Sequence, residues 1–319
     1  VGVAKPVIRG MSLNRVVVVE QGVKQEGQQW GADHGLELDG FNIERVELLK
    51  GPGALAFGTD AIGGVVHIKA PTLPDAGSYR AELAYSYQSN NDLQAASALA
   101  SGNKNGYVWR VRLTHQAYAD YRLPADQFRY NRYVLPLYDR RLKNTAGRER
   151  HASLLAGLER QWGHIWLTGS VFHQESGLFT GAFGTPRPAQ LTPDGDVWDI
   201  ALPAMRTTHL KAILNAQILL NARDWLEVDA GLQHNLRREL AQPHQHGYTF
   251  TLPSEESLRL ELTTATLNVR YQQHWIPRLD GVLGASANRQ QNRRGGYEFF
   301  LPDFELVNGG VFLYEKYAP

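Results

Sequence analysis

Cysteine is absent from this sequence, so disulfides, thiolate metal sites and cysteine nucleophiles are all excluded. Long apolar runs are absent too: Val16–Val19 is among the longest, whereas a membrane-spanning helix needs about 20 apolar residues. Transmembrane strands are not excluded, because their signal is alternation along about ten residues rather than bulk hydropathy.

The sequence also lacks an excess of charge of one sign. Lys and Arg number 33 against 32 Asp and Glu, a formal net charge of +1, so nothing indicates a nucleic-acid partner. With 43% hydrophobic residues among 319, the chain is too apolar to be disordered. Its 31 glycines and 14 tyrosines favour a turn-rich β-protein. The sequence begins at Val1 without a signal peptide, and we interpret it as a fragment.

The first seventy or so residues differ in pattern from the rest. They contain short Val- and Ile-rich runs separated by glycines and polar turns, which predicts a small mixed α/β domain. Leu73–Gly77 then reads as a turn-like linker. We therefore divide the chain into residues 1–71, a linker at 72–78, and residues 79–319.

Long alternating segments dominate the third part. From Leu226 to Gln233 the even positions are apolar, while the odd positions carry Glu227, Asp229, Gly231 and Gln233. Side chains alternate faces along a strand, so such a segment has one apolar and one polar face. About ten segments of this kind lie between Tyr79 and Tyr317. The alternation changes phase near Thr263–Thr264, which indicates either a bulge or a strand leaving the membrane.

The connections between these segments alternate in length. Gln161–Gly163 and Asn221–Asp224 are short, whereas residues 120–148, 175–206 and 239–256 form long loops. Short turns at one end and long loops at the other are typical of an outer-membrane barrel. The alternative is a soluble β-rich binding or adhesion module, since sandwich strands also alternate, although they average five or six residues.

A specific resemblance supports the barrel. Residues 43–52, IERVELLKGP, are followed by Leu55, Phe57–Gly58 and residues 61–68, AIGGVVHI. Together with residues 6–10, 14–16 and 20–23, this segment closely resembles the plug domain of TonB-dependent outer-membrane receptors. The resemblance implies an all-β transmembrane barrel, here partial with about ten antiparallel strands, holding a small α/β plug domain in its lumen. A complete barrel of this kind has about 22 strands.

The same resemblance implies a location and partners. The location is the cell outer membrane of a Gram-negative bacterium, in contact with outer-membrane lipid. The partners are TonB with its inner-membrane energising complex, whose binding box would precede Val1, and a small-molecule or metal ligand. No enzyme is expected, because the sequence has no Gly-x-Ser-x-Gly, His-Glu-x-x-His or Walker motif.

Two groups of residues are predicted to shape the plug. The charged group would lock it to the polar lumen wall; its members are Arg9, Glu44, Arg45 and Glu47. The alternative for these residues is an ordinary exposed strand face. The glycine group would provide tight turns in limited space; its members are Gly10, Gly22, Gly51, Gly58, Gly63 and Gly64.

The ligand is left open between zinc, a ferric siderophore and haem, with no intrinsic cofactor. Asp33 and His34 match an adjacent Asp-His pair in the zinc-uptake branch of the family, and carboxylate and imidazole suit zinc. His244 and His246 lie two apart in a long predicted external loop, where they would capture a metal ion or haem. The alternative for each pair is a hydrogen-bonded or solvated role.

Overall fold

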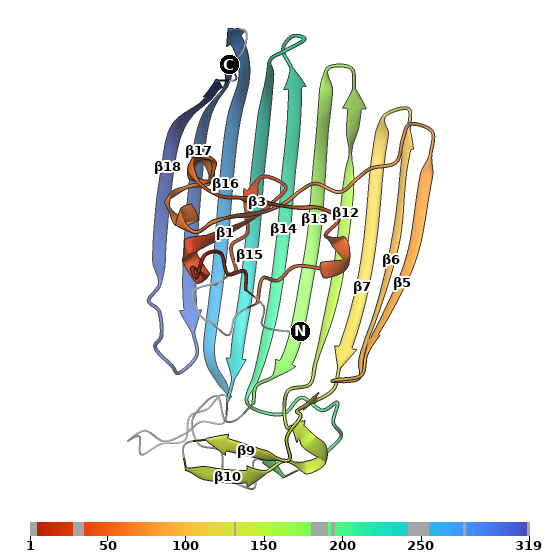
Figure 1. Cartoon of the computed structure of the whole chain (residues 1–319), viewed down its shortest axis with the longest axis vertical. Coiled ribbons are helices and arrows are strands. Elements are labelled where there is room, and N and C mark those ends of the chain that lie inside the picture. Colours follow the sequence, from red (N-terminus) through yellow and green to blue (C-terminus); the bar gives the residue numbers. More distant parts are fainter. Residues whose placement is uncertain are drawn as a thin grey trace.

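The computed structural model describes residues 5–27, 35–130, 132–179, 191–192, 195–241, 255–276 and 279–317. Within them lie an N-terminal domain and a ten-stranded sheet, the wall, which curves behind that domain (Figure 1). No helix in the described ranges combines the length and apolar character that a membrane crossing requires.

The wall is a single antiparallel sheet with its strands in chain order. Its strands are β5 (Tyr79–Gln88), β6 (Leu93–Lys104), β7 (Tyr107–Tyr118), β12 (Gly147–Arg160), β13 (Gly163–Gly177), β14 (Ala204–Leu219), β15 (Trp225–Leu240), β16 (Glu256–Ile276), β17 (Leu279–Gly295) and β18 (Phe304–Tyr317). Strands β5 and β18 form its two edges, so the predicted partial barrel is confirmed as an open sheet. The strands reach 21 residues in β16, far beyond the usual length in a soluble sandwich.

Alternation along the strands gives the wall two different faces. On β14, Lys211, Ile213 and Asn215 are buried against the N-terminal domain, while Leu210 and Leu214 are exposed on the outside. A mostly polar inner face and an apolar outer face invert the pattern of a soluble protein. This inversion favours the membrane wall over the soluble module.

The wall has a turn end and a loop end. At the turn end, residues 105–106, 161–162 and 220–224 connect strands. The longer connections, from β7 to β12, from β13 to β14 and from β15 to β16, leave the strands at the opposite end, the loop end (Figure 1, bottom). The first long loop contains its own small elements, namely β8 (Tyr121–Arg122), β9 (Gln127–Tyr130), β10 (Tyr133–Pro136), η5 (Tyr138–Arg140) and β11 (Arg141–Leu142).

The N-terminal domain is a four-stranded mixed sheet with order β2-β1-β4-β3. Its elements are η1 (Leu13–Arg15), β1 (Val16–Glu20), β2 (Val23–Lys24), η2 (Gly40–Asn42), β3 (Val46–Leu49), η3 (Pro52–Phe57), η4 (Thr59–Ile62) and β4 (Gly64–Ile68). Its small core contains Val17, Val19, Ala54, Ala61 and Val65. The helices described in this domain are 3₁₀ turns rather than the α-helix that a mixed α/β domain implied, because segments of three to six residues are too short for a stable α-helix.

The predicted bulge near Thr263–Thr264 is wrong. Strand β16 pairs with β17 without a register shift from Arg259 to Gln273. The hydrophobic phase changes instead because Leu260 and Leu262 face inward near the loop end, whereas Leu267 faces outward. The strand continues past the apolar belt, as the other interpretation of this segment predicted.

The outward face predicts how the wall tolerates charge. Changing Leu214, at the middle of β14, to Arg should cost about 2–4 kcal/mol of folding free energy in a bilayer, because the guanidinium would be placed in hydrocarbon. The matched change at the turn end, Leu220→Arg, should cost about 0–1 kcal/mol. Urea titration of the receptor folded into vesicles measures both, and equal losses would contradict the assigned belt.

Candidate functional site

The interface between the N-terminal domain and the wall is the candidate functional site. At its centre, the turn between β1 and β2 lies against β13 to β16. Asn215 donates to the Gln21 carbonyl at 2.7 Å, Asn268 to the Gly22 carbonyl at 2.9 Å and Gln233 to the Lys24 carbonyl at 2.9 Å. Wall amides thus satisfy backbone groups that the short hairpin leaves unpaired.

Two further hydrogen bonds complete this contact. Gln233 Oε1 accepts from the Glu26 backbone N–H at 3.1 Å, so one wall amide binds the hairpin backbone at two points. Thr168 Oγ1 donates to the Gln21 side-chain carbonyl at 3.1 Å. The hairpin is therefore bound by side chains from four neighbouring strands.

Close backbone approach sets the shape of the contact. Gly22 has a φ of +82°, and a Cβ there would overlap the Asp229 carboxylate. On the wall, a Cβ at Gly231 would lie 2.5 Å from Val23 Cγ1. Only glycine allows the hairpin to lie this near β15.

One buried ion pair joins β1 to β14. Lys211 Nζ contacts the Glu20 carboxylate and donates to Gln25 Oε1 at 2.6 Å. The Lys211 and Glu20 side chains are 5% and 14% exposed. Removing one partner of such a pair leaves an uncompensated charge, which typically costs about 3–5 kcal/mol.

Glu37 lies near this pair, and Glu37, Glu20 and Lys211 line the same small cavity. It is buried, and its Oε2 atom has no hydrogen-bond partner among the described residues. Burial raises the pKa of Glu37 to about 8, although the charges of Arg237 and Lys211 act against the rise. Glu37 is therefore mostly protonated at neutral pH, because burial outweighs the nearby positive charges and the hydrogen bond with Asn235.

A second contact zone connects residues 39–44 to the wall. Arg110 on β7 donates to Asn42 at 2.5 Å and to Glu44 at 3.1 Å, and Arg80 on β5 lies 3.6 Å from Glu44. Thr114 donates to Asp39 at 2.8 Å. Partial burial would raise the pKa of Glu44, but hydrogen bonds from Thr72 N–H and Arg110 lower it overall, so Glu44 is ionised.

The predicted charged residues occupy different places. Glu44 faces the wall arginines, whereas Glu47 pairs inside the N-terminal domain, with Lys69 at 3.2 Å and Arg45 at 3.9 Å. Arg9 is exposed in the turn that joins Ile8 to Met11.

The predicted ligand residues Asp33, His34, His244 and His246 lie outside the described residues. Within the described part of the chain, no group of three His, Asp or Glu side chains is arranged to hold a metal ion.

The predicted glycines also differ in environment. Positive φ values occur at Gly10, Gly22, Gly51, Gly58 and Gly64. Gly63 has an ordinary helical φ of −75° and instead lies against the Arg15 carbonyl, 2.8 Å from where its Cβ would be.

Sequence reasoning missed Lys211, Asn215, Gln233 and Glu37. The first three stand at polar positions of alternating strands, a signal that places them on the inner face but does not select them among the other polar residues there. Glu37 carries no local signal, because its burial depends on how the two parts of the chain fit together.

Known proteins resemble this chain in its N-terminal part by sequence and over nearly its whole length by fold. Residues 2–65 match the family described as TonB-dependent Receptor Plug Domain. The N-terminal domain is therefore a plug domain of the TonB-dependent receptor kind. Receptors of this kind are transporters of the Gram-negative outer membrane and not enzymes.

Two relatives show sequence similarity to parts of this receptor. The vitamin B12 transporter BtuB of Vibrio vulnificus is 36% identical over 99 residues, 31% of this chain and 16% of that protein. Heme/hemopexin utilization protein C of Haemophilus influenzae is 35% identical over 94 residues, 28% of this chain and 13% of that protein.

Solved structures show the fold over nearly the whole chain. The FrpB iron transporter of Neisseria meningitidis gives a TM-score of 0.74 at 14% identity, covering 99% of this chain and 50% of that one. The unliganded ferric citrate transporter FecA gives 0.63 at 12% identity, covering 99% and 50%. This receptor chain thus spans about half the length of these structures.

The Gly22 contact predicts a specific loss of plug anchoring. Gly22→Ala should destabilise the seated plug by about 1–3 kcal/mol beyond backbone strain, because the added methyl displaces Asp229. Gly10→Ala is the matched control, since Gly10 also has a positive φ, of +75°, but has nothing within 4 Å of its Cβ position. Protease accessibility of the plug in the detergent-solubilised receptor measures both, and equal accessibility would contradict the contact.

Burial of Glu37 predicts a pH dependence. Because its folded pKa, about 8, lies above the ordinary value of 4.5, its contribution is complete at low pH and is lost as pH rises from about 4.5 to 8. The slope is at most about 1.4 kcal/mol per pH unit. Plug stability relative to the Glu37→Gln variant should therefore fall across this window and level off above pH 8.

Denaturant titrations of the wild type and the Glu37→Gln variant, at pH values from about 5 to about 9, measure this difference in plug stability. Glu47→Gln is the control, because Lys69 and the other nearby charges lower the pKa of this exposed carboxyl. Parallel pH profiles for the wild type and Glu37→Gln would contradict the buried, protonated state.

Proposed function

We propose that this receptor imports a scarce metal-containing ligand across the outer membrane with energy supplied through TonB. The observation that carries the proposal is the polar plug–wall interface: hairpin carbonyls are held by Asn215, Gln233 and Asn268 rather than by an apolar core. Water can replace such hydrogen bonds at a small net cost of about 1 kcal/mol each, so the plug is seated firmly yet can be displaced.

The proposed domains follow the sequence division. Residues 1–71 would form the plug, 72–78 the linker and 79–319 the part of the barrel present in this chain. Gly10, Gly22, Gly51, Gly58, Gly63 and Gly64 would shape the plug turns. Of the predicted charged residues, Glu44 would keep the plug in register with the wall, whereas Arg45 and Glu47 would stabilise the plug itself and Arg9 would stay in its exposed turn.

The proposed opening step begins at β1. A pull by TonB on the segment before the plug would load β1, whose last residue, Glu20, is paired with Lys211. Separating this pair exposes both charges to water, which lowers the cost of breaking it relative to a dry interior. The hairpin contacts of Gln21 and Gly22 come next along the chain, so the proposed release proceeds from β1 into the β1–β2 turn.

The proposed cargo is a metal chelate. The named ligands of similar proteins support this class: vitamin B12 for BtuB, heme for the Haemophilus protein and ferric citrate for FecA. Binding would occur at the loop end, where the three long connections lie. The transported ligand would be a ferric siderophore, haem or cobalamin, and no resident cofactor is proposed.

Zinc is the second candidate cargo. Asp33 and His34 in the plug, with His244 and His246 in the loop between β15 and β16, supply the oxygen and nitrogen ligands that zinc prefers. Two plug ligands do not complete a tetrahedral site, so the loop histidines would have to approach them.

Calorimetry of the receptor purified from outer membranes distinguishes the cargoes. Titration with haem, a ferric siderophore and cobalamin should give saturable binding of one chelate that survives Asp33→Ala with His34→Ala. Zinc binding that these substitutions abolish, but that His115→Ala on the outer face preserves, would select the second candidate. No saturable binding of any of the four would contradict the proposed function.

A further inference from the structure

Glu37 is a buried carboxyl that takes no part in the opening step proposed above. It lines one small cavity between the plug and the wall, of about 30 Å³, together with Glu20 and Lys211. Its Oε2 atom has no hydrogen-bond partner among the described residues. A cavity of this size has room for a water molecule. Glu37 therefore stands next to the buried ion pair of β1 and β14 without belonging to it.

Gln25 connects Glu37 to that ion pair. Its Oε1 atom accepts from Lys211 Nζ at 2.6 Å, and its Nε2 atom donates to the Leu36 carbonyl at 3.1 Å. Two residues further along, Gly27 makes room for the carboxyl, because a Cβ there would overlap Glu37 Oε2. The segment after β2 thus holds the Glu37 side chain at the cavity that Lys211 lines.

Glu20 and Glu37 are attached to the wall through different contacts. Glu20 is the last residue of β1, and the turn after it is held by side chains of β14 and β16. Glu37 instead lies two residues before Asp39, which accepts from Thr114 on β7 at 2.8 Å. A pull on β1 can therefore draw Glu20 away from the wall while the segment with Glu37 stays in place.

The other titratable groups near Glu37 are less suited to replace Glu20. Asp39 also lines the cavity, but its carboxylate accepts from Thr114 and, at 3.0 Å, from the Phe41 N–H. The remaining groups carry no negative charge; they are Lys5, His151, His209 and Arg237. Among the carboxyls described at this cavity, Glu37 is the one with a buried oxygen that accepts no hydrogen bond.

We propose that Glu37 is a reserve counter-ion for Lys211 and releases one proton when β1 withdraws Glu20. The O–H bond of the Glu37 carboxyl then breaks, its proton passes to water in the cavity, and the carboxylate that forms pairs with the Lys211 ammonium. The reverse steps return the proton when β1 is seated again. The part that this exchange plays in opening rests on the proposed function, whereas the exchange itself requires only these three side chains.

The exchange lowers the free energy needed to open this contact. Water that enters as Glu20 withdraws offsets part of the cost of separating the ion pair, and a new carboxylate beside Lys211 offsets more of it. A second carboxylate would be unfavourable while Glu20 is still present, because two like charges would then share one site. The neutral form of Glu37 in the seated plug and its ionised form after withdrawal thus have the same cause.

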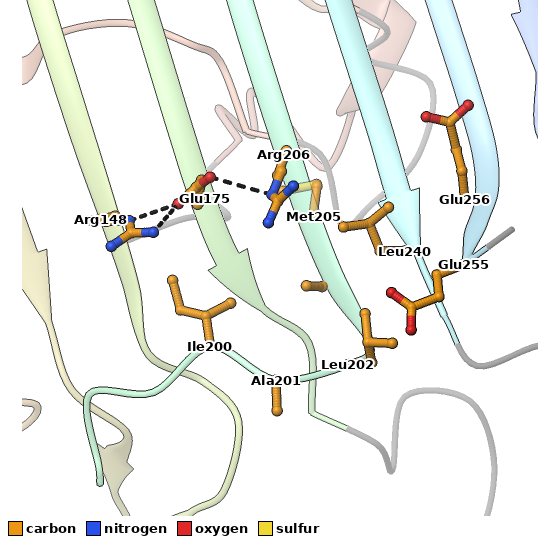
Figure 2. Close-up of a pocket in the computed structure, with 11 residues that line it drawn as sticks. Arg148, Glu175, Ile200, Ala201, Leu202, Met205, Arg206, Leu240, Glu255 and Glu256 are labelled. Atoms are coloured by element: carbon orange, nitrogen blue, oxygen red, sulfur yellow. Dashed lines mark hydrogen bonds and ion pairs between the residues drawn. The ribbon is translucent and has the colours of Figure 1, made fainter. Parts of the chain in front are cut away.

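A carboxylate on the other face of the wall provides a matched comparison. Glu175 lies 2.5 Å from Arg148 and 3.2 Å from Arg206, and Figure 2 shows it between the two guanidinium groups. Both arginines are half-exposed, and their pairing with Glu175 involves no residue of the plug. Glu175 should therefore stay ionised whether or not Glu20 is present.

Infrared spectroscopy of the detergent-solubilised receptor tests the exchange without TonB or cargo. The carbonyl band of a protonated carboxylic acid, assigned to Glu37 by its loss in Glu37→Gln, should be present in the wild type near neutral pH. In Glu20→Gln, which removes the carboxylate as withdrawal does, the midpoint of its titration should fall by about 1–3 pH units, because Lys211 then has no other carboxylate. Adding Lys211→Met to Glu20→Gln should raise the midpoint above that of the wild type.

Controls separate the exchange from a general loosening of the plug. Glu175→Gln should leave the band and its midpoint unchanged, and protease protection verifies that the plug of each variant is seated. Where Glu20→Gln alone exposes the plug, the double variant with Lys211→Met carries the test, since it leaves no unpaired charge.

A wild type without a Glu37 band would overturn the proposal. An unchanged midpoint in a seated Glu20→Gln, or a midpoint in the double variant at or below that of the wild type, would do the same. None of these results bears on import, which the cargo titrations test separately.

Discussion

Hydrocarbon offers no hydrogen bonds, and this single constraint organises the whole receptor. Every backbone N–H and C=O of a membrane-crossing strand must be paired within the protein. Antiparallel pairing of ten long strands meets this demand from β6 to β17, each of which has a neighbour on both sides. Alternate side chains along each strand must then face either the lipid or the interior. Most apolar residues of the strands, such as Leu210 and Leu214, lie on the outer face.

The plug is held by what remains. Because the apolar residues of the strands mostly face lipid, the inner face offers the plug amides, hydroxyls and charges. The plug therefore builds its own small core around Val17 and Val65 and meets the wall through hydrogen bonds. An apolar interface of equal area would be stronger and insensitive to direction, whereas a polar one holds the plug in a unique register yet exchanges readily with water. The protonated state of Glu37 follows from the same geometry, since a carboxyl enclosed without an adequate partner is favoured in its neutral form.

Much of this architecture was predictable from the sequence. Period-two alternation gave the wall and its ten strands, and the spacing of short and long connections gave the turn end and the loop end. The N-terminal motif gave the plug. The interface residues were harder to predict. Gln233 and Asn215 look like any other polar residue at an inward-facing position, and selecting them requires the cross-strand register and the position of the hairpin. The phase change at Thr263–Thr264 was ambiguous for a related reason, because hydrophobicity alone does not separate a bulge from an apolar inward patch.

The two faces of one strand show how far this logic extends. Strand β14 directs Lys211 inward to Glu20 and, five residues earlier, Arg206 outward to Glu175. Both cations lie on the same strand, yet the inner one is buried with its partner and the outer one is half-exposed beside further arginines. A charge enclosed by the plug must be neutralised within the protein, whereas a charge at the edge of the apolar belt can be neutralised by whatever surrounds the wall.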